Sequence, residues 1–171
     1  MFGSGHGSLH GLFSIEDTTR PSPQDNVMIG IASAGADISE FHLPAVEPHL
    51  PDVCDLIEQS EKPVIAAIHG FALGGAFEIA LSTHFRIATK DASVGLPEVH
   101  LGLLPGSAGT QRTPRLVGVK SAIDIMTTGK PVKAEKMARI SVFTRALPSS
   151  AATGCPVPME VPKSPVNARL S

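Results

Sequence analysis

The chain has 171 residues, which is enough for about one domain. Hydrophobic residues make up 42% of the chain, so a buried core is feasible even though the aromatic share is only 4%. The formal net charge of −2 offers no basic surface for nucleic acid. No apolar run reaches the roughly 18 residues that would predict a membrane span. The first residues lack the pattern of a secretory signal peptide.

The residue pattern divides the chain into three regions. Residues 1–25 carry four glycines, which predicts a flexible arm. Residues 26–140 have the apolar periodicity of a globular domain. Residues 141–171 contain five prolines among many Ser and Ala, which predicts a disordered or loosely packed tail. We therefore expect one folded domain between an arm and a tail.

Possible metal ligands and cysteines are sparse. His6 and His10 have no Cys or third ligand at a suitable spacing, so we interpret them as part of the arm rather than as a metal site. Cys54 and Cys155 are far apart and also lack metal-ligand spacing. We interpret them as two free thiols in a reducing compartment, with one disulfide as the alternative. The sequence thus predicts no metal site.

The first half of the central region alternates between strand and helix patterns. Apolar and β-branched runs predict buried strands, while apolar residues at helical spacing predict a helix. Small residues between these segments predict turns. In chain order we expect a strand at 26–32, a turn at 33–37, a helix at 52–59, a strand at 63–69 and a Gly-rich turn at 70–75.

The second half continues the alternation. In chain order we expect a helix at 76–84, strands at 85–89 and 92–95, a second Gly-rich turn at 105–109, a helix from there to 115 or 116, and a helix at 120–128. Gly129 follows the last of these helices and is a favourable C-cap residue.

Gly74 and Gly75 stand between a predicted strand and a predicted helix. The first N–H groups of a helix lack internal partners, and the helix dipole favours negative charge there. Such a turn can stabilise a developing oxyanion, and glycine lets a substrate carbonyl approach the backbone closely. On this pattern alone, tight packing of the turn is the simpler interpretation.

Two carboxylates follow this turn. Glu78 falls in the first turn of the predicted helix, and apolar residues follow it at 79–81. A carboxylate in buried surroundings needs a partner or a function, whereas a surface position at the helix dipole is the alternative. Glu98 comes 20 residues later, on a predicted loop between apolar residues. A surface ion pair is its alternative interpretation.

Five segments carry a resemblance to a known family. They are KPVIAAIHGFALGG at 62–75, VGLPEVHLGLLPG at 94–106, GTQR at 109–112, PRLVG at 114–118 and SAGADI at 33–38. Together they resemble the signature of the enoyl-CoA hydratase/isomerase (crotonase) superfamily over about residues 27–138. The residues of these segments are most similar to those in the hydratase domains of peroxisomal and bacterial bifunctional β-oxidation enzymes. The resemblance implies an α/β fold of repeated ββα units wound into a superhelix, of the ClpP/crotonase type.

The resemblance also implies residue roles. The backbone N–H groups of Ala36 and Gly75 are expected to form an oxyanion hole around a thioester carbonyl. Glu78 and Glu98 are expected to bracket the catalytic water. In this family the Glu98 position usually delivers a proton to C2, and the Glu78 position orients and activates the water. Further substrate-binding positions are Ala34, Gly35, Asp37, Ile38, Gly74, Pro97 and Gly106.

The implied function is that of an enoyl-CoA hydratase. This lyase adds water across the C2–C3 double bond of trans-2-enoyl-CoA thioesters in fatty acid β-oxidation. The partner is then an acyl-CoA substrate that brings its own coenzyme A, and no separate cofactor is expected. A peroxisomal location is implied, with the cytoplasm and the mitochondrion as alternatives. The alternatives for the activity are a Δ3-Δ2-enoyl-CoA isomerase, which can work with one carboxylate, and an inactive truncated fragment.

Departures from the family pattern predict an incomplete domain. No Asn-Arg-Pro-like signature precedes residue 26, and Phe77 stands where a smaller residue is usual, which is expected to narrow the acyl pocket. After Ala138 the sequence departs from the family's continuation, including the C-terminal helices that cover the acyl pocket and build the trimer. We therefore expect weakened homo-oligomerisation.

Overall fold

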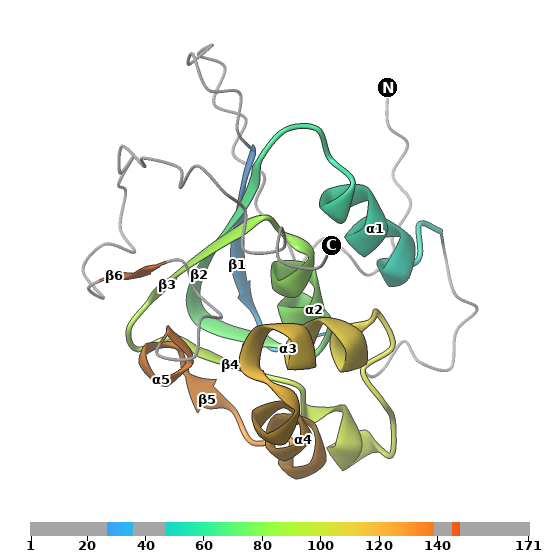
Figure 1. The fold of residues 1–171 in the computed structure, drawn as a ribbon, viewed down its shortest axis with the longest axis vertical. Helices are drawn as coiled ribbons and strands as arrows, with labels where there is room; N and C mark the ends of the chain where they lie inside the picture. The colour runs from blue at the N-terminus through green and yellow to red at the C-terminus, as the bar shows by residue number, and fades with distance from the viewer. Residues whose placement is uncertain (1–26, 36–46, 139–144, 148–171) are drawn as a thin grey trace.

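The computed structural model describes residues 27–35, 47–138 and 145–147 (Figure 1). These residues form a mixed sheet with helices packed mainly on one of its faces. The strands are β1 (Val27–Ser33), β2 (Val64–Leu73), β3 (Phe85–Thr89), β4 (Ser93–Gly95), β5 (Val132–Lys133) and β6 (Arg145–Leu147). The helices are α1 (Leu50–Glu58), α2 (Gly75–Ser82), the short 3-10 helix η2 (Pro97–Leu101), α3 (Gly109–Val117), α4 (Val119–Thr128) and α5 (Ala134–Ala138).

Strand β2 is the centre of the sheet. Strand β1 runs parallel to it on one edge, with Val27 opposite Val64. On the other edge, β3 pairs in parallel with the first half of β2, and β4 pairs with its last three residues. Strand β6 extends the sheet beyond β3, and β5 pairs with β4 in the antiparallel sense. The side chains of β2 belong to apolar clusters on both faces of the sheet, which explains why this strand is apolar over most of its length.

Strand β2 extends further than its sequence predicts. The prediction of a turn over 70–75 is wrong at its start, because Gly70 to Leu73 continue the strand. Strand β4 gives the last three residues a hydrogen-bonded partner, and Ser33 pairs with Ala72 across an irregularity in β1. These long-range pairings override the local turn tendency of Gly70. Only Gly74 is therefore left to form the turn between β2 and α2.

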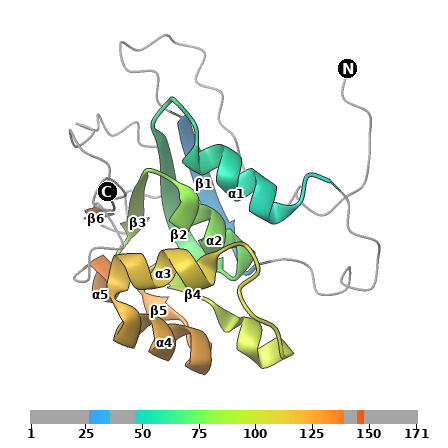
Figure 2. The same cartoon turned by 45° about the vertical axis from the view of Figure 1, so that its right-hand side comes forward.

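Helix α2 is enclosed on all sides. Every residue from Ala76 to Ser82 is buried, and Phe77 lies in the main core. Figure 2 shows α2 between α1 and α3, against the sheet. A helix that is apolar around its whole circumference is expected in such a position. Glu78 is therefore a carboxylate inside the protein, and its surface alternative is excluded.

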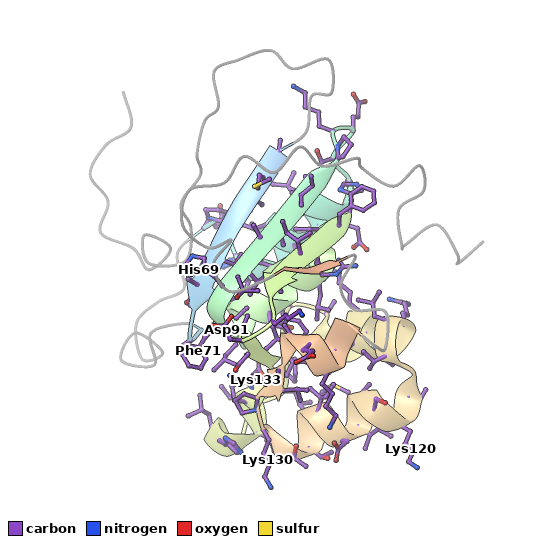
Figure 3. All side chains as sticks on the ribbon, turned by 90° about the vertical axis from the view of Figure 1, so that its left-hand side faces the viewer. His69, Phe71, Asp91, Lys120, Lys130 and Lys133 are labelled. Atoms are coloured by element: carbon purple, nitrogen blue, oxygen red, sulfur yellow. The ribbon has the colours of Figure 1, made fainter. Side chains whose placement is uncertain are left out.

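A smaller apolar cluster lies on the opposite face of the sheet, which is turned toward the viewer in Figure 3. It consists of Ile65, Phe85 and Ile87, with Ala67 packed against it. The residues between them, such as Ala66, belong instead to the main core on the helix side. This alternation follows the two-residue period of a strand.

The remaining predicted elements are confirmed with shifted ends or altered type. Helix α1 begins at Leu50 rather than at 52, because Pro51 is well placed in a first helical turn. Glu98 lies in η2 rather than on a loop, which corrects the prediction. Helix α4 ends at Gly129 with φ 60°, as its C-cap pattern predicts. Residues 145–147, within the expected tail, pair with β3.

No helix in the described ranges combines the length and the apolar character that crossing a membrane requires.

Candidate active site

The turn at Gly74 and Gly75 connects β2 to α2 at the centre of the site. Gly74 has φ 56° and ψ −131°, a conformation that glycine adopts without the steric cost of a Cβ. Its N–H donates to the Gly95 carbonyl at 3.0 Å, and its own carbonyl accepts from the N–H groups of Phe77 and Glu78 at 2.8 and 3.0 Å. Gly75 is the first residue of α2, so its N–H belongs to the donors that lack an intrahelical partner. The turn presents this donor at the positive end of the helix dipole.

Glu78 is held in a fixed orientation inside the core. Only 2% of the residue is exposed. Its Oε1 accepts the backbone N–H groups of Ser107 at 2.7 Å and Gly109 at 2.8 Å. Burial raises the pKa of Glu78 because water no longer solvates its charge, and the two N–H donors together with the charge of Arg112 oppose that rise. The surroundings thus bury the carboxylate and still supply donors to its charged form.

The second Gly-rich turn supplies both donors. Ala108 has φ 64° at the N-cap of α3, a left-handed conformation that costs an L residue about 1–2 kcal/mol. A Cβ added to Gly109 would lie 2.8 Å from Glu78 Oε1 and 2.9 Å from Pro105 Cβ. Only glycine at this position allows the close approach to the carboxylate. The sequence predicts this turn, whereas its N–H groups pointing at Glu78 are visible only in the structure.

Glu98 approaches the first turn from η2. Its Oε1 lies 3.3 Å from the position that a Cβ would take on Gly74. Its Oε2 is buried, and none of the described residues donates a hydrogen bond to it. Burial raises the pKa of Glu98, its own backbone N–H lowers that pKa in part, and the negative charge of Glu78 raises it further. The two carboxylates therefore interact electrostatically around one glycine turn.

The turn after β1 reaches the same place. Gly35 has φ 110°, and a Cβ added to it would lie 3.1 Å from the carbonyl oxygen of Leu73. The Ser33 hydroxyl accepts the Gly35 N–H at 3.2 Å and fixes the start of this turn. The turn thus begins beside the residue that precedes Gly74. The next three predicted site residues lie outside the described residues, namely Ala36, Asp37 and Ile38.

The other predicted substrate-binding positions differ in exposure. Gly74 is buried and Pro97 is half-buried next to Glu98, whereas Ala34 and Gly106 are exposed. Their contact with substrate stays a prediction.

Sequence reasoning misses the residues behind Glu78. Arg112 on α3 is 6% exposed and donates to the Ser107 carbonyl at 2.7 Å. It also donates to Asp55 at 3.2 Å and to Glu58 at 2.7 Å, both on α1. These acids lie 57 and 54 residues away in the sequence, so no local spacing connects them to Arg112. The GTQR segment was the only signal that could have drawn attention to Arg112.

Metal-ligand clusters are not found in the described part of the chain, where no three His, Cys, Asp or Glu side chains gather. His6, His10 and Cys155 lie outside the described residues. Cys54 is a buried free thiol, and burial raises its pKa to about 11. It is accordingly a packing residue at neutral pH.

A surface hollow of about 440 Å³ lies apart from the carboxylates. Its lining comes from α4, β5, α5 and the segment between α4 and β5, and includes Lys130 and Lys133, which are labelled in Figure 3. Lys133 donates from Nζ to the Asp91 carbonyl at 2.8 Å. Neither Glu78 nor Glu98 lines this hollow. We therefore place the candidate site at the two glycine turns and the carboxylates, and not in the hollow.

Comparison with known sequences places the fold in a family. The sequence model described as enoyl-CoA hydratase/isomerase matches residues 30–153. The chain is 45% identical over 137 residues to a peroxisomal bifunctional enzyme of Danio rerio, a match that covers 80% of this chain and 19% of that protein. It is 45% identical over 111 residues to a probable enoyl-CoA hydratase of Bacillus subtilis, covering 61% of this chain and 43% of that protein.

Comparison with solved structures agrees. An enoyl-CoA hydratase from Bacillus anthracis matches with a TM-score of 0.68 at 36% identity, over 74% of this chain and 53% of that one. The chain thus spans about half the length of this hydratase and 19% of the bifunctional relative from Danio rerio. The predicted crotonase-type α/β fold is confirmed, with partial coverage. Since the family match extends over more than half of the sequence, the chain belongs to the enoyl-CoA hydratase/isomerase family.

Proposed function

We propose that this chain carries the hydration site of an enoyl-CoA hydratase, which adds water across the C2–C3 double bond of a trans-2-enoyl-CoA thioester. The observation that supports the proposal is that Glu78 and Glu98 meet at the turn at Gly74: the Gly74 carbonyl accepts the Glu78 N–H at 3.0 Å, and Glu98 Oε1 lies 3.3 Å from the position of a Cβ on Gly74. Two carboxylates in different surroundings, here the buried Glu78 and the half-buried Glu98, are suited to share one water and one proton. The similarity to proteins named as hydratases supports the same proposal.

The backbone donors fit the charge that the reaction develops. Addition of water to a conjugated thioester places negative charge on the carbonyl oxygen. The N–H of Gly75, at the start of α2, is suited to stabilise this oxyanion, and we propose the N–H of Ala36 as the second donor. Removing one such donor costs about 3 kcal/mol in transition-state stabilisation.

The different surroundings of the two carboxylates suggest how they divide the proton transfer. The N–H groups that bind Glu78 favour its ionised form, whereas Glu98 Oε2 has no donor from the described residues. We therefore assign the shared proton to Glu98. The water oxygen bonds to C3, a water proton passes to Glu78, and the Glu98 proton passes to C2. No electron is transferred to or from the substrate, so this reaction requires no redox cofactor, and coenzyme A arrives with the substrate.

Hydration of crotonyl-CoA by the full chain tests the proposal. We expect loss of the absorbance of the conjugated enoyl thioester, and we expect Glu98→Gln to abolish it. Circular dichroism of both proteins establishes that they are folded. A folded, soluble wild-type sample without turnover would contradict the proposal.

The same samples distinguish the alternative activities. Conversion of a 3-enoyl-CoA to the 2-enoyl form that survives Glu78→Gln would instead favour an isomerase, because isomerisation can work with one carboxylate. An inactive fragment that still binds substrate would produce heat in a calorimetric titration with acyl-CoA but no product.

We propose a peroxisomal location, because several relatives are named as peroxisomal bifunctional enzymes. Imaging of the chain tagged at either end, together with a peroxisomal marker, tests this. A cytoplasmic or mitochondrial distribution of both fusions would contradict it.

We also propose weak self-association. Exposed leucines at the end of η2 and just after it, including Leu101 and Leu104, offer apolar surface for self-association. Sedimentation velocity over a range of concentrations measures it, and a single monomeric species throughout would exclude it.

A further inference from the structure

Arg112 connects the turn before its own helix with α1, which lies more than 50 residues away in the sequence. It lies on α3, its guanidinium reaches the Ser107 carbonyl on one side, and it reaches Asp55 and Glu58 of α1 on the other. Figure 2 shows α1 and α3 on either side of α2, the helix that carries Glu78. The Arg112 side chain is 7% exposed, whereas those of Asp55 and Glu58 are 62% and 44% exposed. The buried cation therefore needs its two acids, while the acids have water as an alternative partner.

Arg112 contacts the backbone at the peptide unit that lies between the two donors of Glu78. The Ser107 carbonyl belongs to the peptide unit that joins Ser107 to Ala108. The N–H groups that bind Glu78 belong to the peptide units immediately before and after it, those of Ser107 and Gly109. Each peptide unit is planar, so once the central unit is held, only rotations about φ and ψ of Ser107 and Ala108 can change the direction of the two donors. One contact from Arg112 thus constrains the aim of both donors.

The turn at Ala108 requires such support. Ala108 has φ 64°, a conformation that is unfavourable for any residue with a Cβ. The main-chain N–H of Arg112 donates to the Ala108 carbonyl at 2.8 Å, and its side chain donates to the Ser107 carbonyl at 2.7 Å. Arg112 therefore holds two consecutive carbonyls of the strained turn. Its anchor on α1 keeps the guanidinium in place.

We propose that Arg112 is a positioning residue for Glu78: by holding the Ser107 carbonyl, it keeps the backbone donors of Ser107 and Gly109 aimed at the carboxylate. Arg112 touches neither the proposed water nor the substrate. This inference rests on the proposed hydration by Glu78 and Glu98 wherever it is tested by enzyme activity. A purely structural role, as a connection between α1 and α3, would instead affect only the stability of the fold.

The pH profile of hydration separates these two roles. We expect Arg112→Met to lower kcat about tenfold, within the range that oriented acid–base groups contribute. The acid limb of the profile should move upward by about one pH unit, because the Glu78 carboxylate loses donors and a nearby positive charge. The KM for crotonyl-CoA should stay within about twofold of the wild-type value, since Arg112 contributes no substrate contact. A variant that loses only thermal stability, with kcat and acid limb unchanged, would overturn the inference.

Two further variants complete the experiment. Arg115→Met removes a basic side chain that is exposed on the same helix and leaves the Ser107 contact intact, so it should match the wild type. Arg112→Lys keeps the charge but cannot hold the turn and both acids at once, so it should shift the acid limb less than Arg112→Met. This milder change also provides the test if Arg112→Met does not fold. A wild-type acid limb in folded Arg112→Lys would contradict the inference.

Carbon-13 NMR titration of the Glu78 carboxyl gives a readout that does not depend on turnover. Its resonance is identified by its loss in Glu78→Gln. We expect its titration midpoint to rise in Arg112→Met. If the wild type shows no hydration but this midpoint still rises, the proposed function fails and the positioning role stands. If the wild type is active and the midpoint is unchanged, the positioning role fails.

Discussion

The two carboxylates of the site lie in contrasting regions of the molecule. Glu78 lies on an interior wall, formed by α2 and the turn at Ser107 to Gly109, and backbone donors fix one of its oxygens. Glu98 lies on a rim, the helix η2 and the residues after it, where Leu101 and Leu104 are exposed. The same type of side chain is thus fixed by donors in one region, whereas in the other its Oε2 receives no hydrogen bond from the described residues. This difference suits a fixed base and an acid that exchanges its proton.

The rim residue Glu98 should give the largest effect. We expect Glu98→Gln to lower the kcat of hydration by about 10²–10⁴-fold, the usual contribution of a general acid. Stability should change little, because its Oε2 loses no hydrogen bond from the described residues. Initial rates with crotonyl-CoA and chemical denaturation measure the two quantities. An activity within a few-fold of the wild type would remove Glu98 from the proposed proton transfer.

On the interior wall, Glu78→Gln should lower kcat by about 10²-fold. The Gln side-chain oxygen can still accept the N–H groups of Ser107 and Gly109, so the fold should persist. The same assay measures the loss. An equal loss in Glu135→Gln, an exposed carboxylate on α5, would show that the effect is not specific to the site.

The pH dependence of stability tests the burial of Glu78 separately. Its folded-state pKa is raised above the ordinary 4.5 by burial. A carboxyl with a raised pKa contributes stability that is fully present below that ordinary value and is lost as pH rises through the folded pKa. Since Gln does not titrate, Glu78→Gln should gain stability relative to the wild type as pH rises from about 4 to 7. Urea denaturation across this range checks the sign, and a constant difference would place Glu78 in a water-like environment.

Gly109→Ala should disturb the packing of the interior wall around Glu78 without removing a charge. The added Cβ would lie 2.8 Å from Glu78 Oε1, so the turn or the carboxylate must move. We expect a loss of about 1–3 kcal/mol in the free energy of unfolding, as for other overpacked sites, together with lower kcat. Gly106→Ala is the matched control for stability, because a Cβ there meets nothing within 4 Å. Equal stability of the two variants would contradict the tight approach of Gly109 to Glu78.

Local patterns predict much of this arrangement. The apolar run of β2, the glycine turn before α2 and the C-cap at Gly129 all depend on residues close in sequence, and the structure contains each of them. Glu78 could be singled out because apolar neighbours surround a carboxylate on one helix. Periodicity and composition are sufficient where an element's own residues decide its conformation.

Features that depend on distant partners could not be predicted. Strand β2 gains its last residues from pairing with β4, and Glu98 is brought to Gly74 by the folding of η2. The contacts of Arg112 with α1 join residues more than 50 positions apart. The resemblance to a family predicted the two carboxylates as a pair, but the donors that distinguish their surroundings appear only in three dimensions.

The smallest expected effect concerns Cys54, whose reactivity reports on the packing of α1 without any mutation. This thiol on α1 is buried, and burial raises its pKa to about 11, against the opposing charge of Arg112 and a hydrogen bond with Ser82. At pH 8 only about one molecule in a thousand then carries the reactive thiolate. Alkylation with iodoacetamide, followed by mass spectrometry of the Cys54 peptide, should be slow in the native protein and fast in urea. Equal rates would mean that α1 separates readily from α2 and α3. The contacts of Arg112 with α1 would then break as well, and Glu78 would no longer be held more firmly than Glu98.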